Sequence, residues 1–244
     1  MKRLLTLFFS ICMTMALAAC GGNNTPPASS SDPSSNPSTP DTPTSSTPEP
    51  DSYTSATEDT STASALVVYF SMPETTDPNN MTKAEEDSTI VVDGKVLGNT
   101  QYVALLIQES TGADIFRIEP VTPYPTDHET LVDLADKEQA DAARPPIAGT
   151  IDNLDQYGTI FVGYPNWWGD MPMILYTFFD TYDFSGKTII PFNTHGGSGF
   201  SNTIGTIGSL EPNATVEQNG FTMSRNDMEQ APSRVATWLS EVGF

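Results

Sequence analysis

From about residue 65 to the C-terminus, short apolar runs alternate with segments whose apolar residues recur at helical spacing. The runs suit buried strands of a parallel sheet, because such strands are apolar on both faces. We expect strands at residues 65–70, 114–119, 159–163, 187–193 and 214–217. Strands that alternate with helices predict an α/β fold with a doubly wound parallel sheet.

The segments between these strands carry helix signals. Thr126 and Glu129 have the spacing of a capping box, which predicts a helix that begins there and ends before Pro145. Gly112 is expected to end a helix at 99–111. Further helices are predicted at residues 171–182 and 200–209, and in a last helix with an apolar face of Val235, Trp238, Leu239 and Val242. Phe178, Phe179 and Phe184 are expected in the core.

Two predicted strands lead into loops that suit a planar ligand. Residues 164–169 read Tyr-Pro-Asn-Trp-Trp-Gly, and residues 194–199 read Thr-His-Gly-Gly-Ser-Gly. Open α/β sheets bind ligands at loops that follow the carboxyl ends of their strands. The first loop offers flat indole rings and the second offers backbone N–H groups with little side-chain bulk. A planar cofactor with a polar edge fits this pair better than a sugar or a nucleic acid.

These loops, together with residues 67–71 and 98–100, resemble the flavodoxin-like FMN-binding family, and within it a branch of secreted or lipid-anchored bacterial proteins. The resemblance extends from about residue 65 to the C-terminus. It implies a flavodoxin-like, five-stranded parallel sheet in the order 2-1-3-4-5, with helices on both faces and FMN bound without a covalent bond. The residues expected to bind FMN are Ser71, Gly98, Asn99, Thr100, Pro165, Asn166, Trp167, Trp168, Gly169, Thr194, His195, Gly196, Gly197, Ser198, Gly199 and Phe200.

By this resemblance, each group of residues has its own part of the cofactor. Ser71, Asn99 and Thr100 would hold the phosphate at a helix N-terminus, where unpaired N–H groups favour an anion. Residues 165–169 would flank the ring, and residues 194–200 would wrap its pyrimidine edge. Because adjacent side chains on a loop diverge, we expect one of Trp167 and Trp168 to pack inward and the other to border the flavin. The sequence does not say which.

Residues 72–97 depart from the family pattern, because they separate Ser71 from the helix start at Gly98. They include a predicted β-hairpin around Asp93 and Gly94. Two interpretations are open. Either the insertion bulges out and Ser71 still meets Asn99 and Thr100, or residues 74–76 form a replacement phosphate loop.

Other chemistries fit less well. The sequence from His195 to Ser198 is similar to the oxyanion loop of some lipases, but no Gly-x-Ser-x-Gly elbow followed by a later His is present. His128, between two carboxylates, is interpreted as a solvated, capped first turn of a helix rather than a metal ligand. Residues 108–114 only partly match the pattern of covalently flavinylated proteins.

The formal net charge of −21 excludes nucleic acid and anionic membranes as favoured partners. It suits an electron carrier that docks redox proteins on its acidic surface. An NAD(P)H-dependent FMN quinone reductase remains an alternative, as does an envelope module that has lost FMN. The first two interpretations describe redox proteins, and the envelope module would be non-enzymatic.

The N-terminus predicts export. Residues 1–19 have the layout of a signal peptide, and Cys20 after Leu-Ala-Ala resembles the lipidated cysteine of bacterial lipoproteins. Residues 20–64 are rich in Ser, Thr and Pro and predict a disordered tether to a domain at 65–244. We therefore expect an extracytoplasmic protein that touches the membrane through its lipid anchor.

Overall fold

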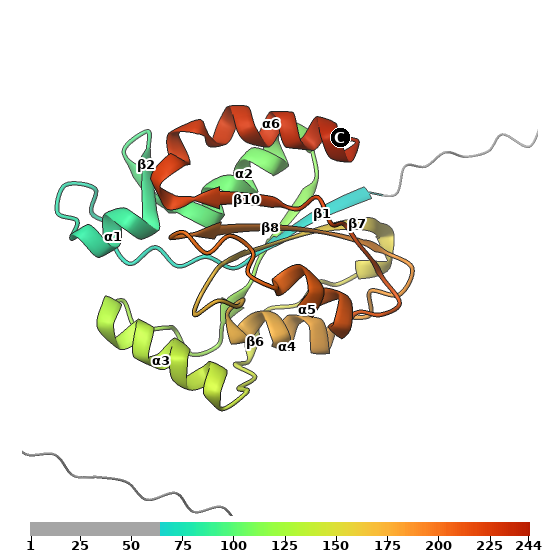
Figure 1. The fold of residues 1–244 in the computed structure, drawn as a ribbon, viewed down its shortest axis with the longest axis horizontal. Helices are drawn as coiled ribbons and strands as arrows, with labels where there is room; N and C mark the ends of the chain where they lie inside the picture. Colours follow the sequence, from blue (N-terminus) through green and yellow to red (C-terminus); the bar gives the residue numbers. More distant parts are fainter. Residues whose placement is uncertain (1–63) are drawn as a thin grey trace, which may run out of the picture. The chain divides into compact units, whose positions relative to one another are not determined.

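The computed structural model describes residues 64–244, so the predicted signal peptide, the lipidated Cys20 and the tether lie outside the described residues. Its centre is a parallel sheet in the order β10-β8-β7-β1-β4, with β9 paired to the start of β8 (Figure 1). This is the predicted order 2-1-3-4-5. The strands are β1 (Ser64–Tyr69), β4 (Asp114–Arg117), β7 (Tyr157–Pro165), β8 (Thr188–His195), β9 (Thr215–Val216) and β10 (Phe221–Ser224).

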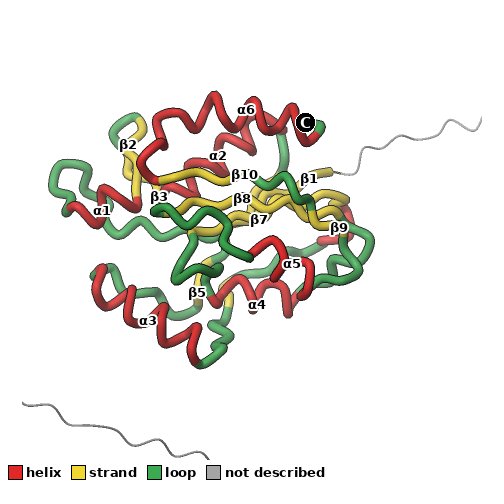
Figure 2. Tube along the Cα trace, in the orientation of Figure 1, coloured by secondary structure: helices red, strands yellow, loops and turns green. Residues whose placement is uncertain are grey.

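Helices cover both faces of the sheet, as expected (Figure 2). Alternate residues of β1 point to opposite faces, so Val67 packs with α2 and α6 while Val68 packs with α3, α4 and α5. Phe178, Phe179 and Phe184 are buried, which confirms their core assignment. The helices are α2 (Asn99–Thr111), α3 (His128–Ala140), α4 (Met173–Thr181), α5 (Thr203–Leu210) and α6 (Ala231–Val242), with a 3₁₀ turn η1 (Leu154–Gln156) before β7.

Two of the predicted boundaries need correction. The capping box at Thr126 is wrong: Asp127 is the N-cap of α3, and its carboxylate accepts a hydrogen bond of 2.9 Å from the N–H of Thr130. A carboxylate one residue later meets the free N–H groups directly, so the helix starts at His128. The second predicted strand ends at Arg117, because Glu119–Pro120 (β5) pairs antiparallel with Ile147–Ala148 (β6).

The fifth strand is divided, and the prediction covered only its first half. β9 pairs with the start of β8, whereas β10 pairs with the end of β8, from Phe221 opposite Phe192 to Ser224 opposite His195. A 3₁₀ segment, η2 (Arg225–Gln230), connects β10 to α6. The carboxyl end of the sheet therefore carries a segment that the sequence analysis left unassigned.

The insertion at residues 72–97 has a structure of its own. A short helix, α1 (Lys83–Ser88), is followed by the predicted hairpin, β2 (Thr89–Val92) and β3 (Lys95–Gly98). Asp93 and Gly94 turn the hairpin with φ values of 49° and 74°. No helix within residues 64–244 has the length and apolar character needed to cross a membrane.

Candidate functional site

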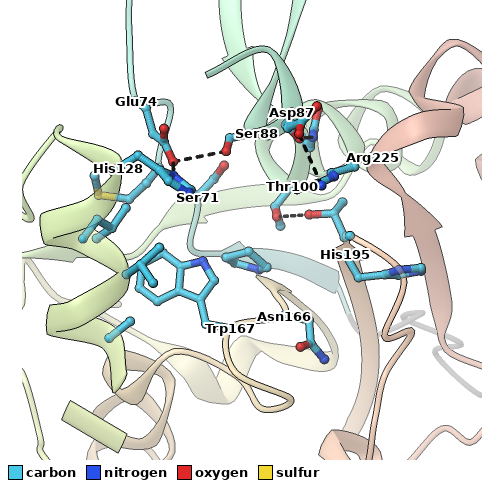
Figure 3. Close-up of a pocket in the computed structure, with 18 of the residues that line it drawn as sticks. Ser71, Glu74, Asp87, Ser88, Thr100, His128, Asn166, Trp167, His195 and Arg225 are labelled. Atoms are coloured by element: carbon cyan, nitrogen blue, oxygen red, sulfur yellow. Dashed lines mark hydrogen bonds and ion pairs between the residues drawn. The ribbon is translucent and has the colours of Figure 1, made fainter. Parts of the chain in front are cut away.

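A cavity of about 260 Å³ lies where β1, β7 and β8 end (Figure 3). It brings together most of the residues that the sequence predicted for cofactor binding, namely Ser71, Asn99, Thr100, Pro165, Asn166, Trp167, Trp168, Thr194, His195 and Gly196. The other predicted residues lie next to this lining and not in it: Gly98, Gly169, Gly197, Ser198, Gly199 and Phe200. The structure thus gathers the starts of both loops, but not their far ends, around one space.

One wall of the cavity joins residues from both sides of the insertion, namely Ser71 before it and the start of α2 after it. Ser71 is buried against Gly98, so closely that a Cβ on Gly98 would lie 2.1 Å from the Ser71 hydroxyl oxygen. Gly98 is the N-cap of α2 and has no side chain to cap the first N–H groups. Ser71 therefore lines the same cavity as Asn99 and Thr100 although residues 72–97 intervene, which agrees with the first interpretation. Of the alternative loop at residues 74–76, Glu74 lines the cavity, whereas Thr75 and Thr76 do not.

Hydrogen bonds join the three chain segments of this wall. The hydroxyl oxygens of Thr100 and Thr194 lie 2.7 Å apart, and both side chains are buried. The N–H of Asn166 donates to the carbonyl of Thr194 at 2.8 Å, and its side-chain amide donates to the carbonyl of Gly199 at 3.1 Å. The two loops and the start of α2 are therefore held as one unit.

The adjacent indole rings have different surroundings. Trp167 packs edge-on against Phe70 and Tyr124, with ring centroids 5.5 and 5.8 Å apart. Trp168 has a left-handed φ of 53°, remains 57% exposed, and donates its indole N–H to the carbonyl of Val132 on α3. The inward ring is thus Trp167, and Trp168 is the ring left at the mouth of the cavity.

A buried carboxylate on the insertion was not anticipated. Oε1 of Glu74 accepts a hydrogen bond of 3.2 Å from the Ser88 hydroxyl. The same oxygen lies 2.8 Å from Nδ1 of His128 (Figure 3). The other carboxylate oxygen of Glu74 is buried with no hydrogen-bond partner among the described residues. The interpretation of His128 as a simply solvated side chain missed this contact. Within residues 64–244 there is no group of three or more His, Cys, Asp or Glu side chains that could hold a metal ion.

Arg225 is a second residue that the sequence analysis missed. It lines the cavity from η2, and its Nη2 lies 3.2 Å from a carboxylate oxygen of Asp87 on α1. Strand register brings Arg225 to the cavity: Ser224 is paired with His195, so Arg225, the next residue, lies beside Gly196. No local sequence pattern gives that register.

His195 has an acceptor role within its own loop. Its Nδ1 accepts a hydrogen bond of 2.9 Å from the N–H of Gly197. Burial lowers the pKa of the imidazole, and the positive charge of Arg234 lowers the pKa further, while Asp227 opposes both effects. The neutral ring is therefore favoured in the folded protein.

Comparison with known proteins identifies the family. The sequence profile of a family described as flavodoxin matches residues 89–242, and the chain belongs to this flavodoxin family. No functionally curated protein matches the chain.

Solved structures of flavoproteins are similar to this chain. A candidate flavoprotein from Bacteroides eggerthii DSM 20697 is similar with 24% identity and a TM-score of 0.56, over 74% of this chain and 98% of that one. A candidate flavoprotein from Bacteroides uniformis ATCC 8492 has 25% identity and a TM-score of 0.54, over 71% and 98% of the two chains. A flavoprotein from Lactobacillus acidophilus NCFM, crystallised with FMN, has 17% identity and a TM-score of 0.48, over 72% and 98%.

Proposed function

We propose that this protein binds FMN without a covalent bond and serves as an electron carrier outside the cytoplasm. The observation that carries the proposal is the convergence of three segments on one cavity, fixed by the 2.7 Å contact between Thr100 and Thr194. In a flavodoxin fold, this is the position where the strands' carboxyl ends offer a ligand site. FMN, when bound, supplies the redox chemistry.

The side chains and backbone fit this cofactor. Ser71, Thr100 and the uncapped N–H groups of α2 are donors for the phosphate. The buried side-chain oxygen of Asn99 has no hydrogen-bond partner among the described residues, so a donor from a ligand would satisfy it. Trp168 offers an exposed aromatic face, and the loop from Thr194 offers backbone N–H groups to the polar edge of the ring.

Binding of FMN is the first test. Titration of FMN with the purified full chain should quench flavin fluorescence to a one-to-one end point at micromolar concentrations. Acid precipitation should then release all the FMN, because no bond to the protein holds it. Absence of binding would favour the envelope module that has lost FMN, and flavin that stays with the precipitate would contradict the non-covalent site.

The role outside the cytoplasm rests on the sequence. The signal-peptide layout of residues 1–19 and the position of Cys20 support a lipid anchor on the bacterial cell membrane. The net charge of −21 supports redox partners that dock through basic surfaces, since opposite charge raises the rate of encounter. Electron transfer of this kind needs an exposed ring edge and no bound second substrate.

The source of the electrons is the second test. Under anaerobic conditions the FMN-loaded protein is mixed with NADH or NADPH, and a separate sample is titrated with dithionite. We expect dithionite to reduce the flavin in two resolved one-electron steps and pyridine nucleotides to leave it oxidised. Rapid bleaching by NADPH, followed by turnover of a quinone, would replace the electron carrier with the reductase.

A further inference from the structure

Arg225 lines the cavity from η2, in the C-terminal part of the chain. Its neighbour Ser224 is paired with His195, and a Cβ on Gly196 would lie 3.3 Å from the guanidinium carbon. On its other side, Nη2 of Arg225 lies 3.2 Å from the carboxylate of Asp87. The side chain is 42% exposed, so a ligand can reach it.

Asp87 in turn lies at the start of α2. Its carbonyl oxygen accepts a hydrogen bond of 3.0 Å from the side-chain amide of Asn99. The guanidinium is thereby brought to the helix end whose N–H groups have no side-chain cap. Asn99 is only 5% exposed, and its buried side-chain oxygen has no hydrogen-bond partner among the described residues. This oxygen is an acceptor, so it marks the corner as a place for a ligand that carries a donor, such as a ribityl hydroxyl of FMN, next to its phosphate.

The charges of the lining explain why a cation is needed there. Glu74 and Asp87 are both carboxylates of the cavity, and Arg225 is its one lysine or arginine among residues 64–244. A phosphate monoester beside two carboxylates is repelled by both of them. A guanidinium matches phosphate geometry with two parallel N–H donors, which an ammonium group does not.

We propose that Arg225, with the N-terminus of α2, forms an anion subsite for the phosphate of FMN, and that Asp87 holds and competes for the guanidinium. The inference rests on the proposed function. It differs from the site expected from sequence, in which Ser71, Asn99, Thr100 and a helix N-terminus hold the phosphate without any charged side chain. Arg225 leaves Asp87 in part when the phosphate binds, and no covalent bond changes.

The test measures dissociation constants for FMN and for riboflavin, which lacks the phosphate, with the full chain and its variants. Arg225→Gln should weaken FMN by ~10- to 100-fold, the range of a hydrogen bond to a charged group, and change riboflavin by less than ~2-fold. Asp87→Asn removes the competing charge and should tighten FMN several-fold while leaving riboflavin unchanged. Arg225→Lys should retain part of the FMN affinity, because it keeps the charge and loses the fork.

Arg144→Gln is the matched control. Arg144 is 40% exposed and pairs with Asp180 at 2.5 Å, yet it does not line the cavity, so both flavins should bind its variant as they bind the wild type. If Arg225→Gln and Asp87→Asn both weaken FMN and riboflavin alike, the ion pair is structural and the anion subsite is wrong. Equal FMN affinity in all variants would also overturn it. A wild type that binds neither flavin would overturn the proposed function, and this inference with it.

Discussion

At the scale of single residues, the two indole rings show how one backbone angle separates two roles. The left-handed φ of Trp168 turns the chain between the rings, and Gly169, with a φ of 79°, completes the turn. Residues other than glycine seldom adopt this backbone conformation. The result is that Trp167, which also lines the cavity, packs against the core beside Phe70, while Trp168 stands exposed at the mouth of the cavity.

This separation predicts different losses for the two tryptophans. Trp167→Ala should lower the free energy of unfolding by about 3 kcal/mol, because it opens a void beside Phe70 and Tyr124. Trp168→Ala should weaken FMN by ~1–3 kcal/mol, the scale of stacking on an aromatic ring. Chemical denaturation and fluorescence titration measure the two effects.

The control for these variants is Trp238→Ala on α6, a buried ring outside the cavity, which should cost stability and leave FMN binding unchanged in the folded protein. Small and equal effects of Trp167→Ala and Trp168→Ala on both properties would mean that neither ring touches the flavin.

At the scale of helices and strands, the sequence predicted what depends on local pattern. The bounds of α2 match because Gly112 ends the helix with a left-handed φ of 69°, and the hairpin matches because Asp93 and Gly94 favour its turn. The strand order was implied by family resemblance and is confirmed. These features are specified within a few neighbouring residues or by family membership.

The features that escaped prediction depend on partners far along the chain. α1 has a capping box of Thr82 and Glu85, but it is only 6 residues long and has no buried residue, so no apolar face marked it. β10 is 4 residues long and is defined by its pairing with β8. The cavity residues Glu74 and Arg225 reach the site through such elements, and their positions therefore could not be read locally.

At the scale of the whole molecule, the excess of acidic groups bears on stability. Glu211 ends α5, where the helix dipole also disfavours a negative charge. Burial, and then the charges of Asp183 and Asp180, raise the pKa of this carboxyl to about 7. Folding therefore favours its protonated form, and stability is lost as the pH rises from the unfolded pKa of about 4.5 through about 7.

Glu211→Gln should accordingly be more stable than the wild type at pH 8 and equally stable at pH 4. Because the side chain is only partly buried, solvent screens the charges around it, and we expect a gain of only ~1 kcal/mol at pH 8. Thermal unfolding across this pH range measures the difference. Glu229→Gln removes the same charge at an exposed position, and a gain as large as that of Glu211→Gln would attribute the effect to net charge alone.

The contact between Ser71 and Gly98 has a consequence for how this chain can change during evolution. Since the two ends of the 72–97 excursion already touch, its length hardly affects the rest of the sheet: each doubling of a loop costs only ~0.6 kcal/mol of closure entropy. Drift and selection can then rewrite Glu74 and Asp87 without disturbing the strands beneath them. The excursion can therefore be exchanged for one with other side chains, which would change the chemistry of the cavity wall and keep the sheet.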